Sequence, residues 1–224
     1  MYNKNSRINE ALSLQSKYCY SNSNVLKNKL GIKDEKELEA IEKNLTTLML
    51  MDLQMKSIPR ANVLFSIDYL LSLHKYVFGN LYSFSGKIRD ENIVKGNTPF
   101  CRPEFIYNYL SMLIEKMKDD IKKLKSKDDV INFLAFYYSE LNIVHPFREG
   151  NGRIIREYLR QIVVFINNCL DFDCELDFSN ITEEDKNNLI NGSKVSAMSG
   201  NLDLLYKFFS NTLKEKELTK EHQI

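Results

Sequence analysis

Apolar residues recur at helical spacing along most of the chain, and this pattern predicts a protein built from helices. The clearest stripe lies between Asp128 and Val144, where an apolar residue returns every three or four positions. Asp34 and Thr182 precede two other stripes, where a side-chain oxygen can cap the first backbone amides of a helix. The same spacing predicts helices over residues 33–56, 66–78, 103–125, 150–167, 182–198 and 201–216. We therefore expect an all-α (mainly α) fold of about seven helices.

The chain is expected to form a single domain over residues 1–224. It has 224 residues, 43% of them hydrophobic, without internal repeats or low-complexity linkers, and that length suffices to bury one substantial core. We place this core between about residues 20 and 213, with peripheral segments at 1–20 and 214–224.

Charge and cysteine usage narrow the classes of partner and compartment. A net charge of +1 with interspersed signs argues against nucleic acid or a membrane surface as the main partner, and no apolar run is long enough to span a bilayer. The four cysteines lack the paired spacing of a zinc site, and no signal peptide precedes them. We expect reduced thiols and a cytoplasmic protein, with delivery into another cell left open.

The polar chemistry of the chain is concentrated between the fourth and fifth predicted helices. Pro146 disfavours helical geometry at His145, so the preceding helix should end there and turn the imidazole into the loop. The apolar stripe that resumes at Ile154 places two glycines at the mouth of the next helix, whose first backbone N–H groups carry a partial positive charge. The run reads His145-Pro146-Phe147-Arg148-Glu149-Gly150-Asn151-Gly152-Arg153, and Arg156 follows.

These residue types suit a nucleotide polyphosphate. Glycines let backbone amides approach phosphate oxygens closely, and Arg153 and Arg156, three positions apart, can offer both guanidinium groups from one helix face. Glu149 beside such a cradle requires a cation between its carboxylate and the phosphates, and Mg²⁺ is the usual one. His145 can accept a proton from a hydroxyl group. The run therefore predicts a base, a metal ligand and an anion-binding cradle.

The segment from His145 to Arg156 resembles, at every position, the H-P-F-x-[D/E]-G-N-G-R-x-x-R signature of the Fic (filamentation induced by cAMP) domain family. The segment from Ser83 to Gly96 is similar to the family's flap hairpin, although the alternation over residues 87–95 is too weak to predict a hairpin alone. Leu26 to Ile32 resembles the N-terminal segment of stand-alone bacterial members. The resemblance covers nearly the whole chain and implies a Fic-type helical bundle with a small β-hairpin flap.

The resemblance also implies an activity. Most Fic proteins are protein adenylyltransferases, which transfer AMP from ATP to a Ser, Thr or Tyr hydroxyl of a target protein, release pyrophosphate and use Mg²⁺ or Mn²⁺; automodification is expected too. The implied catalytic residues are His145, Glu149, Asn151 and Arg153, with His145 as the base and Glu149 as the metal ligand. Phe147 is expected to anchor the loop in the core.

Two regions are implied to contact the nucleotide or the target. The backbone of Gly150 to Gly152, aided by Asn151 and Arg153, is expected to bind the α- and β-phosphates, and Arg156 the terminal phosphate. Residues of the flap are also implied to contact the nucleotide. The strand that they form is expected to hold the target backbone by β-strand addition, with the target hydroxyl facing the base His145. The nucleotide-contacting flap residues are Val94, Lys95 and Gly96, and the target-docking residues are Ile93, Val94 and Lys95.

Two alternatives to AMP transfer stay open. One is transfer of another nucleotide or phosphate-linked group, such as UMP, GMP or phosphocholine, by the same site. The other is a catalytically quiet nucleotide-binding or regulatory module of a toxin–antitoxin pair, which the complete motif disfavours. Phosphate transfer, as in Doc-type kinases, is disfavoured because the cradle from Gly150 to Arg153 is intact.

Regulation has three candidate arrangements. Ser6 and Glu10 fit the first five positions of the family's inhibitory pattern [S/T]-x-x-x-E-[G/N], but Ala11 breaks the sixth. The restraining glutamate is thus Glu10, or it comes from a small antitoxin, or such control is absent. A homo-oligomer is a further candidate partner state. His74 and His222 lie in no motif, and we interpret them as a structural residue and a tail residue.

Overall fold

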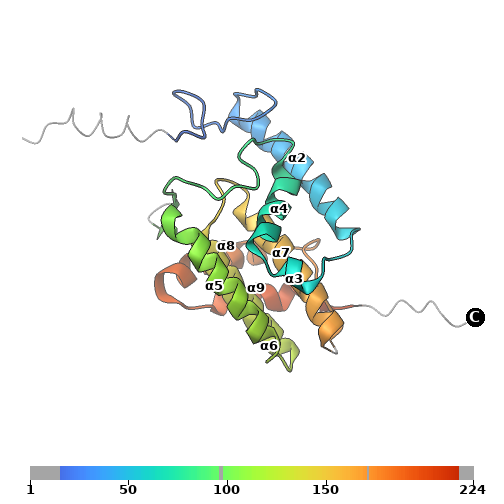
Figure 1. The fold of residues 1–224 in the computed structure, drawn as a ribbon. Coiled ribbons are helices and arrows are strands. Elements are labelled where there is room, and N and C mark those ends of the chain that lie inside the picture. The colour runs from blue at the N-terminus through green and yellow to red at the C-terminus, as the bar shows by residue number, and fades with distance from the viewer. Residues whose placement is uncertain (1–15, 96–97, 171, 217–224) are drawn as a thin grey trace, which may run out of the picture.

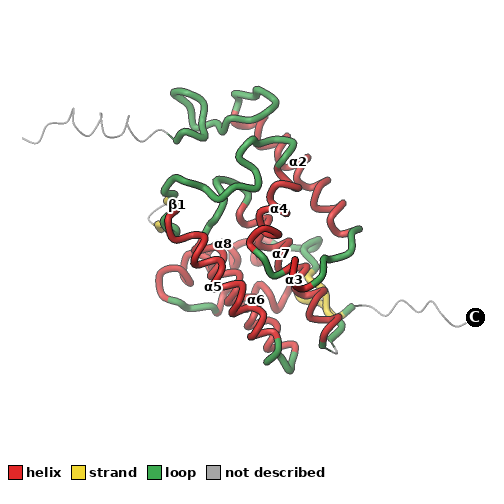
Figure 2. The backbone as a smooth tube through the Cα atoms, viewed as in Figure 1, coloured by secondary structure: helices red, strands yellow, loops and turns green. Residues whose placement is uncertain are grey.

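The computed structural model describes residues 16–95, 98–170 and 172–216, and within these ranges the chain forms eight helices and two small antiparallel sheets (Figures 1 and 2). The helices are α2 (Glu35–Gln54), α3 (Ala61–Leu64), α4 (Ile67–Phe78), α5 (Pro103–Ile121), α6 (Lys127–Val144), α7 (Asn151–Cys169), α8 (Glu183–Ser199) and α9 (Asp203–Thr212). The strands are β1 (Val94–Lys95), β2 (Thr98–Pro99), β3 (Cys174–Leu176) and β4 (Leu213–Glu215). The mainly helical fold that the sequence predicts is confirmed.

Side-chain caps fix the beginnings of several helices. Asp34 accepts a hydrogen bond from the backbone N–H of Glu37 at the start of α2, as its position predicts. Ser126 and Thr182 each form a reciprocal capping box with an aspartate three residues later, at the starts of α6 and α8. The described residues form one helix more than the seven that the sequence predicts. The additional helix is α3, which has four residues and is too short for periodicity to reveal.

The last predicted helix is wrong over its final residues. Helix α9 ends at Thr212, and the chain then pairs as β4 with β3, in a register that places Leu213 opposite Leu176. Both leucines are buried, so the pairing covers one edge of the core. A local pattern does not reveal a strand whose partner lies far away in the sequence. Lys214 and Glu215, which we had assigned to the peripheral tail, take part in this pairing.

Helix α6 occupies the centre of the bundle. It packs against α5, α7, α8 and α9, while α7 also contacts α4, which in turn contacts α2 (Figure 1). Gly192 lies inside α8 rather than ending it, and a Cβ there would come within 3.0 Å of Leu205 on α9. The glycine therefore permits the close approach of α8 to α9.

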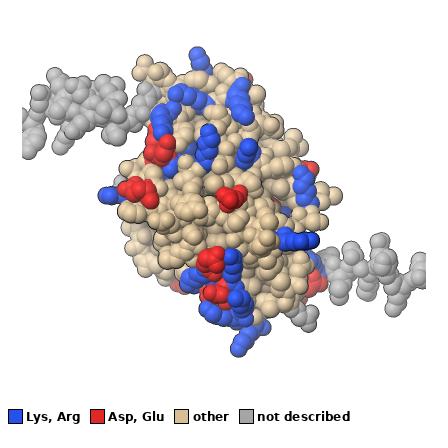
Figure 3. Space-filling model, viewed as in Figure 1, with Lys and Arg blue, Asp and Glu red and all other residues tan. Residues whose placement is uncertain are grey.

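The surface carries both signs of charge. Near the end of α5 and in the loop to α6, lysines and aspartates form ion pairs such as Lys116 with Asp120 and Lys122 with Asp119. Figure 3 shows basic and acidic side chains mixed on the face that it draws. Across the described ranges, no helix combines the length and apolar character needed to cross a membrane.

Candidate active site

His145 ends α6 in a left-handed conformation, with φ 47° and ψ 60°. Its N–H still bonds to the carbonyl of Leu141 at 3.0 Å, so the helix continues up to this residue and stops there, as Pro146 predicts. The imidazole stacks on Phe100, with ring centroids 3.8 Å apart. Nδ1 lies 3.2 Å from the carbonyl of Asn142, which favours a proton on Nδ1 and places the basic lone pair of the neutral ring on Nε2.

Phe147 and Asn151 hold the catalytic loop, residues 145–150, from within. Phe147 is fully buried, as predicted. The Asn151 side chain accepts from the Phe147 N–H at 2.9 Å and donates to the Phe147 carbonyl at 2.7 Å. Both polar atoms of this buried amide are thus bonded to the loop backbone. The second proton on Nδ2 and the backbone N–H of Asn151, at the first turn of α7, are not used in these two bonds.

His74 joins the catalytic loop to the segment that precedes the β1–β2 hairpin. Its Nε2 lies 3.0 Å from the carbonyl of Glu149, and its Nδ1 accepts a hydrogen bond from the Gly86 N–H at 2.8 Å. The ring also stacks on Phe147, with centroids 3.9 Å apart. Since Nδ1 is an acceptor, the proton is on Nε2 and the ring is neutral. Desolvation lowers the His74 pKa to about 4. The structural interpretation of this histidine is confirmed.

Gly150 begins α7 and is the position where the backbone demands glycine. It has φ 78°, and an added Cβ would lie 2.1 Å from the ring of Phe78. No described side chain caps α7, so its first amides face outward with the positive end of the helix dipole. At Gly152 a Cβ would meet, among described atoms within 4 Å, only Arg156 Nη1 at 3.4 Å. The cradle thus lies at the mouth of the helix, as predicted.

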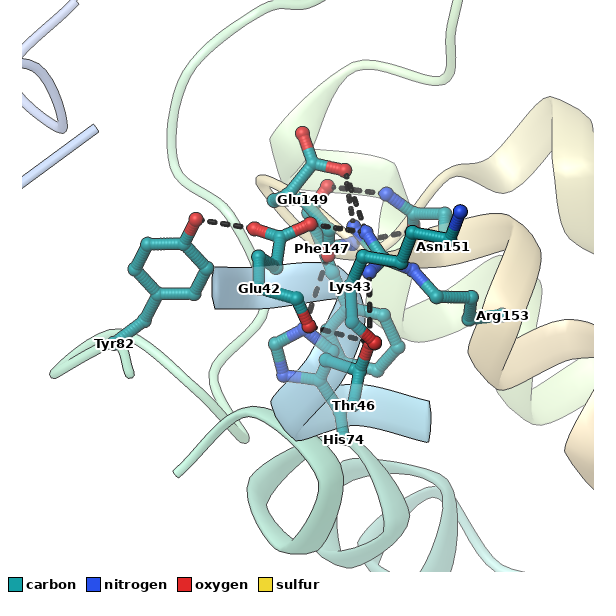
Figure 4. A network of polar contacts seen from close by, with 10 residues as sticks. Glu42, Lys43, Thr46, His74, Tyr82, Phe147, Glu149, Asn151 and Arg153 are labelled. Atoms are coloured by element: carbon teal, nitrogen blue, oxygen red, sulfur yellow. Dashed lines mark hydrogen bonds and ion pairs between the residues drawn. The ribbon is translucent and has the colours of Figure 1, made fainter. Parts of the chain in front are cut away.

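Glu149 and Arg153 project toward α2 (Figure 4). The Glu149 Oε1 atom accepts from the Gly150 N–H at 2.8 Å and lies 3.5 Å from Arg153 Nη2. Arg153 donates to the Thr46 hydroxyl at 3.0 Å and to the Glu42 carboxylate, and its guanidinium lies over the Phe78 ring, 4.8 Å from the centroid. Arg153 is therefore held by α2 rather than directed at open solvent. Sequence reasoning assigned no role to Glu42 or Thr46, which lie in no motif.

Three adjoining cavities surround the catalytic loop. The phosphate cavity, about 360 Å³, is lined by Ile93, Val94, Phe100, His145, Arg148 to Arg153, and Arg156. The second cavity, about 230 Å³, adjoins it at His145, Gly152 and Arg156. We call it the base cavity after the nucleobase of the expected nucleotide, not after His145. Helices α6 and α8 supply its other walls through Tyr138, Asn142, Leu189, Ile190, Ser193 and Lys194. The α2 cavity, about 500 Å³, lies between the loop and α2 and includes Glu39, Glu42, Lys43, Tyr82, Arg148, Glu149 and Arg153. His145 and Arg156 therefore border two cavities at once.

The β1–β2 hairpin borders the phosphate cavity and has Arg89 at its base. Strand β1 pairs with β2, Val94 opposite Pro99, and Ile93 and Val94 line the cavity. The Lys95 backbone belongs to β1, whereas Gly96, Ser6 and Glu10 lie outside the described residues. The hairpin itself, expected from resemblance, is present.

Arg89 is 1% exposed, and backbone carbonyls take up its hydrogen bonds. It donates to His145 O at 2.7 Å, Glu91 O at 2.6 Å, Val144 O at 3.3 Å and Cys101 O. Glu91 and Cys101 flank the hairpin, and Val144 and His145 end α6. One guanidinium thus joins both ends of the flap to the backbone of the predicted base. Its place in the flap motif was the available sequence signal, but the motif did not indicate this role.

Glu149 is the carboxylate that fits a divalent cation. Within the described ranges, no group of three or more His, Cys, Asp or Glu side chains could hold a metal ion by itself. The Oε1 atom of Glu149 is bonded to the Gly150 amide, and Oε2 has no partner among the described residues. One protein carboxylate with remaining ligands from phosphate and water is an ordinary arrangement for Mg²⁺.

Comparisons with known proteins agree with this geometry. The model of the Fic/DOC family matches residues 64–163. Protein adenylyltransferase VbhT of Bartonella schoenbuchensis is 32% identical over 158 residues, which are 70% of this chain and 32% of VbhT, so the chain spans about a third of that relative. The probable protein adenylyltransferase Fic of Escherichia coli is 24% identical over 88% of this chain and 92% of its own length. BepC of Bartonella tribocorum, solved with bound AMPPNP, has the same fold, with a TM-score of 0.75 and 21% identity over 89% of this chain and 97% of BepC.

We predict that His74 makes the stability of the protein depend on pH below neutrality. Its folded pKa of about 4 lies below the ordinary value of 6.5, so the unfolded chain binds the proton first as the pH falls. The stabilisation is complete above about pH 6.5 and is lost as the pH falls toward 4, at a cost of about 2 kcal/mol between pH 7 and 5. Urea unfolding of the wild type and of His74→Gln at both pH values measures this difference, and parallel pH profiles would contradict it.

We predict that Arg89→Lys destabilises the protein by about 2–3 kcal/mol, because a lysine keeps the charge but cannot satisfy carbonyls in several directions. Arg102→Lys is the matched control, since that side chain is 72% exposed. Chemical denaturation of both variants measures the effect. Equal stability of the two would show that the bonds made by Arg89 contribute little.

Proposed function

Because the chain belongs to the Fic/DOC family, we propose that it is a protein adenylyltransferase that transfers AMP from ATP to a Ser, Thr or Tyr hydroxyl of a target protein. The observation that carries this proposal is the placement of His145 and the uncapped amino end of α7 in one cavity. A base and an anion-stabilising backbone are the two elements that phosphoryl-centred transfer requires. The names of VbhT and of the Escherichia coli relative support the same activity.

The reaction is a displacement at the α-phosphorus of ATP. His145 Nε2 accepts the proton of the target hydroxyl as its oxygen bonds to the α-phosphorus. The bond from that phosphorus to the oxygen bridging to the β-phosphate breaks, and pyrophosphate leaves with the bonding electrons. The first amides of α7 stabilise the charge on the α-phosphate oxygens, and Arg156 binds phosphate from the boundary of two cavities. Mg²⁺ or Mn²⁺, held by Glu149, would neutralise charge on the polyphosphate.

The base cavity is the region that fits the adenine ring. It adjoins the phosphate cavity at Gly152, and its walls include Leu189 and Ile190 from α8 and Tyr138 from α6. Its volume of about 230 Å³ and its largely apolar lining suit a planar base. Nucleotide selection on this proposal depends on α8, a helix that contributes nothing to the signature motif.

The flap is the region that fits the target protein. Val94 is 60% exposed on β1, beside the cavity that contains His145. An extended target segment that adds to this short sheet gains backbone hydrogen bonds without a sequence requirement, and its hydroxyl then faces the base. An automodified residue would reach the same site.

We predict that the protein incorporates label from ATP labelled at the α-phosphate, but not from ATP labelled at the γ-phosphate, into itself or into proteins of a cell extract. His145→Ala should lose this incorporation while it retains binding of AMPPNP, because the base is removed but the cradle remains. Intact-mass spectrometry of a labelled product should show a gain of about 329 Da, the mass of one AMP moiety added as a phosphodiester. Incorporation from γ-labelled ATP alone would establish phosphate transfer instead. Nucleotide binding without any incorporation would favour a regulatory binding module.

We predict that Ser193→Trp raises the KM for ATP roughly tenfold or more and lowers kcat much less, because the indole fills the base cavity without touching the reacting atoms. Ser199→Trp, on an exposed position of the same helix, is the matched control. Steady-state rates of AMP incorporation over a range of ATP concentrations measure both parameters. Unchanged KM in Ser193→Trp would place the base elsewhere.

A further inference from the structure

A chain of polar contacts joins α2 to the carboxylate that faces the cation (Figure 4). The Glu42 carboxylate, 12% exposed, accepts hydrogen bonds from Arg153 Nη2 and from the Tyr82 hydroxyl. On the same helix the Thr46 hydroxyl accepts from Arg153 Nη1 at 3.0 Å and donates to the Glu42 carbonyl at 2.7 Å. Helix α2 therefore presents two acceptors, side by side, to the planar fork of one arginine.

Arg153 stands between two carboxylates. Its Nη2 atom is bonded to Glu42 and lies 3.5 Å from Oε1 of Glu149, which is longer than a good charged hydrogen bond. Glu149 lies just before the N-cap of α7 and Arg153 in its first turn, close enough for an ion-pair contact of 3.5 Å. The shorter contact of Arg153 goes to Glu42, and the Glu149 carboxylate keeps the longer 3.5 Å contact to Arg153 beside its 2.8 Å bond to the Gly150 amide.

We propose that Glu42 is a positioning residue of the transfer site: it holds Arg153 on α2 and thereby keeps the Glu149 carboxylate available to a divalent cation. This inference rests on the proposed function for the role of the cation. Without Glu42, Glu149 is the nearest remaining carboxylate for a guanidinium that is only 25% exposed and stays charged. Arg153 would then pair with Glu149 and compete with the cation for the same oxygens.

Nucleotide binding with the cation and nucleotide binding without it are expected to respond differently, which separates positioning from a purely structural role. Loss of the Glu42 charge weakens the contribution of the cation to nucleotide binding, because Arg153 occupies Glu149. The same loss removes a negative charge near the polyphosphate, so nucleotide binding without a cation stays equal or becomes tighter. A general loosening of α2 would instead weaken nucleotide binding both with and without the cation.

The test compares Glu42→Gln with Glu39→Gln in the full-length protein. Glu39 is one turn earlier on α2 and lines the same cavity, but among the described residues it contacts neither Arg153 nor Glu149. Isothermal titration with α,β-methylene-ATP, which cannot transfer AMP, gives the affinity with Mg²⁺ and with EDTA. We expect the factor by which Mg²⁺ strengthens binding to fall about tenfold in Glu42→Gln and to stay at the wild-type value in Glu39→Gln.

Three results for the variants would overturn the proposal. They are an unchanged Mg²⁺ factor in Glu42→Gln, an equal fall in binding with EDTA, and the same shift in Glu39→Gln, which would show that net charge alone acts. A wild type whose binding Mg²⁺ does not strengthen would overturn it as well. Because the readout is binding, it is separate from the proposed function, which fails only if the wild type incorporates no AMP.

Tyr82→Phe provides a second variant that leaves the Glu42 charge in place. It removes only the hydroxyl that donates to Glu42, while the ring keeps its stacking on Phe84, with centroids 4.7 Å apart. The Mg²⁺ factor should fall in the same direction but by less than in Glu42→Gln. No change in either variant, with thermal melting as for the wild type, would leave Glu42 without a positioning role.

Discussion

The arrangement of the site depends on one buried charge, the guanidinium of Arg89. A charged group in the interior is tolerated only when its donors are satisfied, and here backbone carbonyls do this. Burial lowers the pKa of Arg89, because removal from water disfavours the charged form. Those carbonyls belong to the two ends of the flap and to the last residues of α6. The flap therefore cannot move independently of His145 without leaving part of a buried charge unsatisfied.

In the catalytic loop, as around Arg89, side chains hold the backbone in place. Asn151 and His74 use their polar atoms to hold the loop through Phe147, Glu149 and Gly86. The positive φ of Gly150 then orients the first amides of α7 outward. Asn151, a polar residue of the motif, thus fixes the loop geometry, and on the proposed function the main chain would provide the anion cradle. Such a cradle has little freedom to reorganise when charge develops on a bound phosphate.

Sequence periodicity predicted most of the helices because they bury an apolar stripe, and Pro146 predicted where α6 ends because its effect is local. The β3–β4 pairing was missed because its partners are distant in the sequence, and the role of Asn151 because a motif names a residue but not its hydrogen bonds. Glu42 was missed for a further reason. It lies on a helix with no motif, and its contact with Arg153 arises only when the fold brings α2 close to the first turn of α7.

The two arginines of the motif show most clearly what the sequence alone could not predict. Arg153 and Arg156 lie on one face of α7 by their spacing, and the sequence treats them as a matched pair of phosphate ligands. In the fold both arginines border the phosphate cavity, but Arg153 is bonded to Glu42 and Thr46 of α2, whereas Arg156 also borders the base cavity. The difference comes from the elements that flank α7 on either side. Spacing within a motif determines which residues share a helix face, and the neighbouring helices determine how each of them is held.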